Sequence, residues 1–409
     1  MKNIIQFGTG AFLRGFVDWM ISEVCDKTEF NSKITVIQST ERGLADAINT
    51  APEYTLIARG IENGTPTVKK YLVNSLAGCV NTATDYDAFL ALAKDASYKY
   101  IVSNTTEAGI AYNPDDKSDV PAKSFPAKLT QLLYERFKAG LDGFTILPCE
   151  LIENNAGELK QIVLRYINQW NLGDNFARWI ETENKFLNTL VDRIVTGFDE
   201  SVGDDNPLTN TCELYHIWVI EGEDIGIPFA EAGLNVVYTD NLDKYRTRKV
   251  RILNGAHTSL IPYALLEGEE TVLDAIGNAK LKKHLEGCLR EVLPTLGDLY
   301  CEEELNAYMN EIIERFSNPY IKHKCSAIAL NSISKFKVRC LPSIKAYYEI
   351  YKKPPENLSV ACNKLIEFYK NGNPCDDTVL IEYIRTHTEE EILSGGIVFG
   401  EDISKYIAG

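Results

Sequence analysis

The N-terminal segment joins a short apolar run to a glycine-rich turn, and it constrains the fold more than any other part of the chain. Asn3–Phe7 has the pattern of a buried strand, and Phe12–Glu23 follows with helical spacing. Between them, Gly8-Thr9-Gly10 permits close approach of the backbone to a phosphate, and the free N–H groups of the helix start attract an anion. A strand, a G-x-G turn and a helix in this order predict the first unit of a dinucleotide-binding α/β domain.

The glycine turn departs from the usual G-x-G-x-x-G fingerprint at its third glycine. Leu13 stands in that place, and Gly15 follows two residues later. An ordinary strand–helix turn is the alternative interpretation. We expect Arg14 to reach a phosphate. The loop residues expected to contact the cofactor are Gly8, Gly10, Phe12, Leu13 and Arg14.

The strands that follow bear on the choice of cofactor. The second strand, Lys33–Gln38, ends in an amide where NAD-binding domains usually carry an acid. Gln38 can hydrogen-bond a ribose without repelling a 2′-phosphate, and Arg42 can attract one, so NAD and NADP both stay open. After the strand Tyr100–Ser103, we expect Asn104 and Thr105 to contact the nicotinamide ribose, with a loop-capping role as the alternative.

The rest of the first half alternates strand and helix patterns, which predicts a mostly parallel sheet with helices on both faces. Helical spacing occurs at Ala88–Lys94 and Pro126–Ala139. The strand patterns are Tyr54–Arg59, Lys70–Val73 and Phe144–Pro148, and the first two are joined by the turn Glu62-Asn63-Gly64. We expect two later strands, near Tyr215–Ile220 and Asn235–Tyr238, to extend the same sheet.

Beyond residue 245 helical patterns replace the strands. They cover Val250–Leu265, Val272–Asn278, Lys280–Val292, Glu302–Phe316, Asn357–Tyr369 and much of the tail from Thr378 to Gly409. The sequence therefore predicts an α/β chain in which a Rossmann-type cofactor domain, residues 1–245, is followed by an all-helical substrate domain, residues 246–409.

Composition excludes several classes of protein. The net charge of −16, from 42 Lys plus Arg and 58 Asp plus Glu, argues against nucleic-acid or anionic-membrane partners. No apolar run approaches the roughly 20 residues of a membrane span, and the first residues lack a signal-peptide pattern, so we expect a cytoplasmic protein. The ten cysteines are scattered without a C-x-x-C pair, which favours buried thiols over a metal site.

A local reversal of charge marks the start of the helical half. Lys244–Arg251 holds five cations in eight residues, and Asn254 and His257 follow. A solvated helix entrance is the plain interpretation of the basic run. However, at about 100° per residue Lys249, Asn254 and His257 fall within an arc of about 140°, so one pocket can contain all three.

These three residue types suit metal-free oxidation of a secondary alcohol. Lys249 would take the hydroxyl proton, since burial and the neighbouring arginines disfavour its ammonium form. Asn254 would donate to the reacting oxygen, and His257 would hold that oxygen or the next hydroxyl. Tyr245-x-x-x-Lys249 also matches the spacing of short-chain dehydrogenases, but it occurs too late in the chain and the glycine pattern differs.

Lys249-x-x-x-x-Asn254-x-x-His257 resembles the catalytic signature of the polyol-specific long-chain dehydrogenases, the mannitol dehydrogenase family. The Gly8–Gly15 loop is similar to that family's cofactor loop. Longer segments are similar to its tagaturonate reductase (altronate oxidoreductase) branch: Ser103–Ile110, Pro148–Ile152, Thr189–Gly197, Ile252–Thr258 and Asn318–His323. The resemblance implies NAD-linked interconversion of D-tagaturonate and D-altronate, with Lys249 as acid and base. It gives no oligomeric state.

The resemblance also implies substrate contacts. A second oxyanion asparagine is expected soon after Cys149-Glu150, where Leu151 stands, and either Asn154 or Asn155 is the candidate. The sugar-acid carboxylate needs a cation, for which the candidates are Lys322, His323, Lys335 and Arg339.

Asp192 and Arg193 are further candidates for substrate contact, with an internal ion pair as the alternative. Three other functions remain open for the whole chain. They are fructuronate reduction, mannitol-type polyol oxidation, and nucleotide sensing without catalysis.

Overall fold

The computed structural model describes residues 2–40 and 42–408, which form two compact units. The first unit comprises Met1–Arg59 and Val68–Leu242. The second comprises Gly60–Thr67 and Asp243–Gly409, so it includes the tip of a β-hairpin from the first half of the chain. The expected boundary near residue 245 falls inside the helix α8 (Leu242–Arg248).

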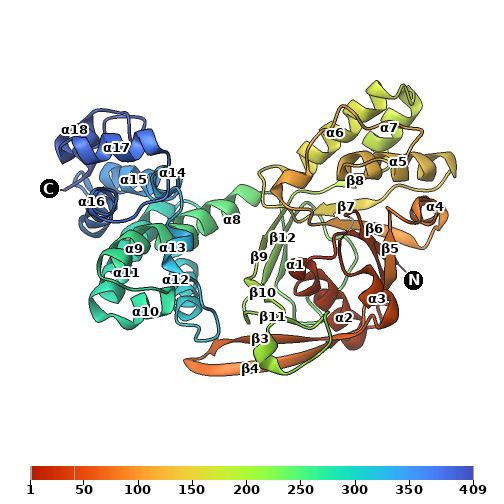
Figure 1. The fold of residues 1–409 in the computed structure, drawn as a ribbon, viewed down its shortest axis with the longest axis horizontal. Helices are drawn as coiled ribbons and strands as arrows, with labels where there is room; N and C mark the ends of the chain where they lie inside the picture. The colour runs from red at the N-terminus through yellow and green to blue at the C-terminus, as the bar shows by residue number, and fades with distance from the viewer. Residues whose placement is uncertain (1, 41, 409) are drawn as a thin grey trace. The chain divides into compact units, whose positions relative to one another are not determined.

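A six-stranded parallel sheet organises the first unit (Figure 1). Its strand order is β5-β2-β1-β6-β7-β8. The strands are β1 (Asn3–Phe7), β2 (Ile34–Gln38), β5 (Leu76–Asn81), β6 (Tyr98–Ser103), β7 (Thr145–Pro148) and β8 (Lys185–Phe186). The order reverses at β1, because the chain moves to β2 on one side and to β6 on the other. The carboxyl end of β1, at Gly8, is therefore the topological switch point where such sheets bind ligands.

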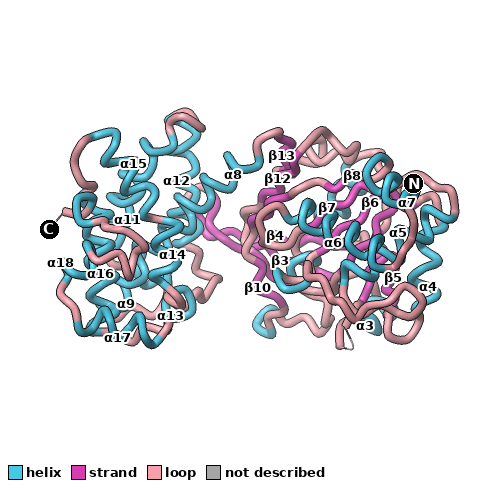
Figure 2. The backbone as a smooth tube through the Cα atoms, turned by 90° about the horizontal axis from the view of Figure 1, so that it is seen from above, coloured by secondary structure: helices cyan, strands magenta, loops and turns pink. Residues whose placement is uncertain are grey.

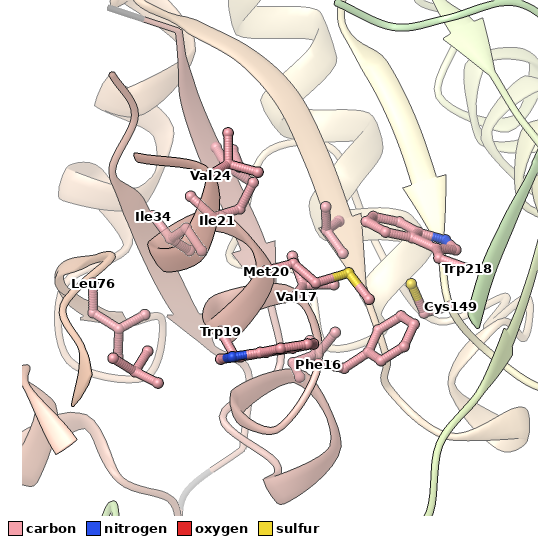
Figure 3. Close-up of a cluster of buried hydrophobic side chains, with 14 of the residues drawn as sticks. Phe16, Val17, Trp19, Met20, Ile21, Val24, Ile34, Leu76, Cys149 and Trp218 are labelled. Atoms are coloured by element: carbon pink, nitrogen blue, oxygen red, sulfur yellow. The ribbon is translucent and has the colours of Figure 1, made fainter. Parts of the chain in front are cut away.

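Helices cover both faces of this sheet, as expected. Side chains alternate along β1, so that Ile4 joins one hydrophobic core and Ile5 and Phe7 join another. The first core contains α2 (Val17–Lys27) and is shown in Figure 3. The helices of the unit are α1 (Ala11–Arg14), α2, α3 (Ala45–Thr50), α4 (Tyr86–Ala91), α5 (Phe125–Lys138), α6 (Asn155–Gln169) and α7 (Asp174–Thr182). This is the expected Rossmann-type architecture.

Two smaller sheets lie beside the main one, and they correct one expectation. β12 (Ile217–Glu221) and β13 (Val236–Thr239) do not extend the parallel sheet but form a three-stranded sheet with β9 (Thr189–Asp192). The physical reason is burial, because the ring of Trp218 in β12 packs 5.8 Å from Phe16, next to α2. The apolar strand β12 is buried against α2 and does not join the edge of the parallel sheet.

The other small sheet has the order β10-β11-β3-β4. Its strands are β3 (Tyr54–Glu62), β4 (Thr65–Val73), β10 (Val195–Gly197) and β11 (Asn210–Cys212). The expected turn between β3 and β4 is present, since Asn63 and Gly64 both have positive φ, as a two-residue type I′ hairpin requires.

The second unit is helical apart from the hairpin tip (Figure 2). Its central helix α9 (Gly255–Leu266) is buried on nearly all sides. The others are α8, α10 (Val272–Gly277), α11 (Ala279–Val292), α12 (Glu302–Phe316), α13 (Cys325–Ile328), α14 (Ser332–Arg339), α15 (Leu341–Tyr351), α16 (Glu356–Asn371), α17 (Thr378–Thr386) and α18 (Glu389–Ser394). The expected helix over Val250–Leu265 is interrupted, because a π-helical turn η4 (Lys249–Asn254) precedes α9.

Candidate active site

The glycine turn after β1 has the shape that a dinucleotide loop needs. Gly8 has φ +122°, and a Cβ there would lie 2.9 Å from the Asn104 carbonyl oxygen, so only glycine fits. A Cβ on Gly10 would meet nothing within 4 Å, which leaves the outer side of the turn open. The residues present therefore fit a pyrophosphate at the start of α1.

Gly15 replaces the missing third glycine of the fingerprint. A Cβ on Gly15 would lie 2.9 Å from Cγ1 of Val195 in β10 and 3.1 Å from Nδ2 of Asn210 in β11. The third glycine of the fingerprint serves close packing of helix and strand, and here Gly15 serves it two residues later.

Arg14 lies beneath the turn and not on its outer side. The residue is 5% exposed, its Nη1 donates to the Thr9 carbonyl at 2.5 Å, and its Nε donates to the Leu208 carbonyl at 3.3 Å. These contacts correct the expectation that Arg14 reaches a phosphate. Leu13 is 1% exposed, and the ring of Phe12 stacks on Phe16 at 5.1 Å, so both support the loop through packing.

The amide of Gln38 at the end of β2 is engaged by its own loop. Its Oε1 accepts from the Ala45 N–H at 2.9 Å, and its Nε2 donates to the Thr40 carbonyl at 3.1 Å. We expected this amide to contact a ribose, whereas these bonds show it shaping the loop after β2.

The loop after β6 is held by a carboxylate that the sequence analysis did not single out. Asn104 donates from Nδ2 to the Cys149 carbonyl at 2.8 Å, which supports its loop-capping alternative. The backbone N–H and the hydroxyl of Thr105 both donate to Oε1 of buried Glu150 at 2.9 Å. Burial raises the pKa of Glu150, and its hydrogen bonds with Thr105 oppose that shift.

The two candidate oxyanion asparagines differ in their surroundings. Asn155 is 1% exposed, and its Nδ2 donates to the carbonyls of Pro148, Glu150 and Thr189 at 3.0 to 3.1 Å. Its side chain is therefore unavailable to a substrate, which removes it from the expected site. Asn154 is exposed, and its Oδ1 accepts from Asn188 at 3.0 Å. Its Nδ2 has no partner within the described part of the chain.

Arg193 is also a structural residue, contrary to the expected substrate contact. It is 6% exposed, and its guanidinium donates to the carbonyls of Gly15 at 2.8 Å and Glu213 at 3.1 Å. It also lies over the ring of Trp19 at 4.2 Å. Its hydrogen bonds thus go to main-chain oxygens and not to Asp192, which is buried in β9.

The expected catalytic side chains lie in the second unit, on the π-helical turn and the helix after it. A π-helix bonds residue i to residue i+5. Lys249 and Asn254 are five apart and bound η4, so they occupy successive turns of one face. The α-helical geometry assumed from the sequence would separate them by about 140°. The π-helix is thus the local feature that brings the two side chains together.

His257 follows one turn later, in α9. Its ring packs against Phe316 with centroids 4.2 Å apart and lies 5.2 Å from the His323 ring. Burial lowers the pKa of His257 to about 3, and the charges of Arg315, Arg339 and a protonated His323 act in the same direction. The imidazole is therefore neutral at neutral pH, although the nearby Leu253 backbone weakly opposes the shift.

Among the four expected carboxylate ligands, the structure brings two close to His257: the His323 ring lies 5.2 Å away, and the charge of Arg339 lowers the pKa of His257. Arg339 donates from Nη1 to the Thr258 hydroxyl at 3.3 Å, and that hydroxyl donates to the Asn254 carbonyl at 2.9 Å. Lys335 interacts with Arg339 through its charge, and its Nζ donates to the Ile328 carbonyl at 2.8 Å.

The remaining candidate for the carboxylate, Lys322, is exposed to solvent. Arg315 is a cation near His257 that the sequence analysis missed. A signal was present, because Arg315 falls on the same stripe of α12 as buried Tyr308 and Ile312.

The cations of the basic run Lys244–Arg251 contact different neighbouring side chains. Lys244 lies over the Tyr300 ring at 4.2 Å, and Arg248 lies over the Tyr308 ring at 4.3 Å. Arg246 pairs with Asp243, and Arg251 donates to the Ser343 hydroxyl at 3.0 Å. These contacts engage the run with neighbouring side chains, so the cation for the substrate carboxylate is expected in the later segment.

No helix within residues 2–40 and 42–408 combines the length and the apolar character that crossing a membrane requires.

Comparison with known proteins agrees with this architecture. Residues 2–228 match the mannitol dehydrogenase Rossmann domain, and residues 241–392 match the mannitol dehydrogenase C-terminal domain. An altronate oxidoreductase of Bacillus subtilis is 40% identical over 403 residues, which cover 94% of this chain and 83% of the relative. An altronate oxidoreductase of Bacteroides thetaiotaomicron is 36% identical over 438 residues, covering 99% and 91%.

Solved structures share the fold. A D-sorbitol dehydrogenase in substrate-free form superposes with a TM-score of 0.83 at 22% identity, covering 98% of this chain and 88% of the other. The ternary complex of Pseudomonas fluorescens mannitol 2-dehydrogenase with NAD and D-mannitol gives 0.70 at 18% identity, covering 100% and 87%. With both of its domains matched along nearly its whole length, the chain belongs to the mannitol dehydrogenase family of oxidoreductases.

Proposed function

We propose that this chain is an NAD-dependent oxidoreductase that interconverts D-tagaturonate and D-altronate. The observation that carries the proposal is the set of groups around η4, where a lysine and an amide share one face and a guanidinium is bonded to the same segment through Thr258. The relatives named altronate oxidoreductase support the substrate class.

The residues of the second unit supply proton transfer and oxygen binding. A bound nicotinamide supplies the hydride acceptor or donor. Lys249 takes the hydroxyl proton during oxidation and returns it to the developing alkoxide during reduction. Asn254 donates to the reacting oxygen, since its side-chain amide has no other partner among the described residues.

His257 holds a substrate hydroxyl as a neutral group. Its lowered pKa keeps the imidazole uncharged, and a neutral imidazole has one nitrogen that accepts a hydrogen bond. That nitrogen can accept from the hydroxyl next to the reacting carbon.

Arg339 is the cation we assign to the sugar-acid carboxylate. Burial lowers the pKa of His323, which leaves that imidazole uncharged at neutral pH. The amine of Lys335 is engaged by the Ile328 carbonyl, and Lys322 is exposed. Arg339 keeps its charge and carries the planar fork that binds a carboxylate through two hydrogen bonds.

In the first unit, the Gly8–Gly10 turn and the free N–H groups of α1 would hold the pyrophosphate of the dinucleotide. We propose NAD because the Pseudomonas neighbour is a complex with NAD. NADP remains the alternative, since no acid follows β2 to repel a 2′-phosphate.

A substrate panel tests the proposal. Initial rates are measured for tagaturonate, fructuronate and fructose, each with NADH and with NADPH. We expect the highest kcat/KM for tagaturonate with NADH. A preference for fructose would contradict the role of Arg339, and a preference for fructuronate would assign the sister reaction. Calorimetric binding of NADH without turnover of any sugar acid would favour a sensor.

A further inference from the structure

A buried polar cluster lies directly beneath the glycine turn. It consists of Gln6 from β1, Arg14 from α1, Asp18 from α2 and Tyr54 from β3. Gln6 and Asp18 are 0% exposed, and Tyr54 is 2% exposed. An ionisable acid in such a place requires a physical explanation, because burying a charge without full pairing is costly.

The cluster holds the backbone of the turn from below. Gln6 donates from Nε2 to the Gly8 carbonyl at 3.3 Å, and Arg14 donates from Nη1 to the Thr9 carbonyl at 2.5 Å. Tyr54 donates its hydroxyl proton to the Arg14 carbonyl at 2.8 Å. Three side chains thus fix carbonyl groups of the segment that would bind the pyrophosphate.

Two acceptors in the cluster lack a donor. Oδ1 of Asp18 and Oε1 of Gln6 are both buried without a hydrogen-bond partner among the residues that the structure describes. The Tyr54 hydroxyl is 3.4 Å from the other carboxyl oxygen and 2.8 Å from the Arg14 carbonyl, so its one proton is shared unequally and favours the carbonyl. A proton on Asp18 supplies the donor that these acceptors lack.

The charged and titratable groups that face Asp18 are Arg14 from α1 and Tyr54 from β3. Burial raises the pKa of Asp18 to about 7, while the charge of Arg14 and the neighbouring polar groups of Gln6 and Tyr54 oppose that shift. Ser75, just before β5, donates to the main-chain carbonyl of Asp18 at 2.7 Å and leaves the carboxyl untouched. Both protonation states are therefore populated near neutral pH.

We propose that Asp18 is a positioning residue for the glycine turn, which binds the dinucleotide pyrophosphate more tightly when this carboxyl carries a proton. The protonated form leaves the Arg14 charge uncompensated beneath the anion and donates to Gln6, whose amide then stays turned toward the Gly8 carbonyl. The ionised form adds a negative charge beneath the same turn. The inference rests on the proposed dinucleotide binding but not on the sugar acid.

The direction of the pH effect follows from linkage. If the protonated form binds NADH more tightly, binding takes up a proton, and affinity falls as pH rises through the pKa of Asp18. The charge lies close to the turn but is partly offset by Arg14, so we expect the dissociation constant to rise about three- to ten-fold from pH 6 to pH 8.5.

The test compares NADH dissociation constants, from nicotinamide fluorescence, across this pH range. Asp18→Asn keeps the size of the side chain and a donor for Gln6, so its dissociation constant should change by less than about two-fold. Glu158→Gln removes an exposed carboxylate from the first turn of α6 and should keep the wild-type slope. A wild-type slope in Asp18→Asn would overturn the proposal.

A second measurement needs no variant. Calorimetric titration of the wild-type chain with NADH at pH 7, in two buffers of different ionisation enthalpy, should show net proton uptake. Binding without proton uptake would overturn the role of Asp18 even if Asp18→Asn does not fold. If NADH does not bind at any pH, the proposed function fails, and this outcome is distinct from a failure of the Asp18 role.

Discussion

The two units use their polar motif residues in different ways. In the cofactor unit, Arg14, Arg193 and Asn155 direct their side chains to main-chain carbonyls of the unit itself. In the helical unit, the amide of Asn254 has no protein partner among the described residues, and Arg339 has only the Thr258 hydroxyl as a hydrogen-bond partner. The same residue types are thus structural in one unit and available to a ligand in the other.

The difference follows from how the backbone carbonyl groups of each unit obtain hydrogen-bond donors. Turns and strand ends of an α/β domain leave carbonyl groups that must find donors, because buried polar backbone groups are rarely left unpaired. Long side chains meet this need in the cofactor unit. A helix satisfies its own carbonyls internally, so side chains on α9 and α14 are not required for that purpose. A motif residue is therefore more readily a ligand contact where no loop or strand-end carbonyl within its reach needs a donor.

The largest expected effect is loss of the proposed base in the helical unit. Lys249→Ala should lower kcat by about 10²- to 10⁴-fold, the usual contribution of a general acid or base. The melting temperature should stay within about 2 °C of wild type, because Lys249 is only partly buried and truncation at such a position costs little. Lys282→Ala, an exposed lysine on α11, is the control and should leave kcat unchanged. Wild-type turnover in Lys249→Ala would remove the base from the mechanism.

Asn154 and Asn155, which follow β7, give a direct test of the contrast, because one amide is bonded to the backbone and the other is not. Asn154 has a free Nδ2 and a left-handed backbone with φ 50°, which glycine tolerates. If it is the second oxyanion donor, Asn154→Gly should lower kcat by about 10²- to 10³-fold with little change in stability. Unfolding in urea and kcat are measured for both asparagine variants.

Asn155 is the matched partner in that experiment. Asn155→Ala leaves the carbonyls of Pro148 and Glu150 without their donor, so it should cost about 1–3 kcal/mol of unfolding free energy. A stable Asn155→Ala with impaired kcat would reverse the assignment and show that bonds to the backbone do not exclude a catalytic role.

Arg193 tests the structural side of the comparison. Arg193→Met retains most of the apolar stem but leaves the Gly15 and Glu213 carbonyls without donors. We expect a loss of about 2–5 kcal/mol in unfolding free energy by urea titration. The KM for the sugar acid should stay close to wild type in the folded fraction. A stable protein with a greatly raised KM would return Arg193 to the substrate site.

Much of the architecture was predictable from periodicity. The expected helix Glu302–Phe316 matches α12 at both ends, and the expected strands Tyr54–Arg59 and Phe144–Pro148 lie on β3 and β7 within a few residues. The alternation of strand and helix patterns predicted a sheet covered on both faces, and the two cores on either side of β1 confirm it. These features depend on local sequence, so a single chain reveals them.

The roles of the polar residues were not predictable in this way. Arg14 bonds to Leu208, and Arg193 bonds to Gly15, so the partners that fix each role lie almost half the chain away. The π-helix was missed because a reading at 100° per residue assumes an unbroken α-helix. Arg315 was missed because it stands in the last turn of α12, where a basic residue is ordinary and does not by itself suggest a site. Each error concerns a tertiary partner or an exception to a regular period.

The smallest expected effect on activity concerns the carboxylate ligand, and it tests whether a helix-borne cation binds the substrate. Arg339→Leu keeps the bulk of the side chain in α14 and removes the charge. A charge-assisted hydrogen bond contributes about 1.5–3 kcal/mol, so kcat/KM for tagaturonate should fall about 10- to 150-fold. The rate with uncharged fructose should fall much less, because fructose has no carboxylate to lose. Lys322→Met, from the same set of candidates but exposed, should leave both rates near wild type. Equal losses for the charged and the uncharged ketose would show that Arg339 stabilises the Asn254 segment through Thr258, as Arg193 stabilises its own unit, and the contrast between the two units would then disappear.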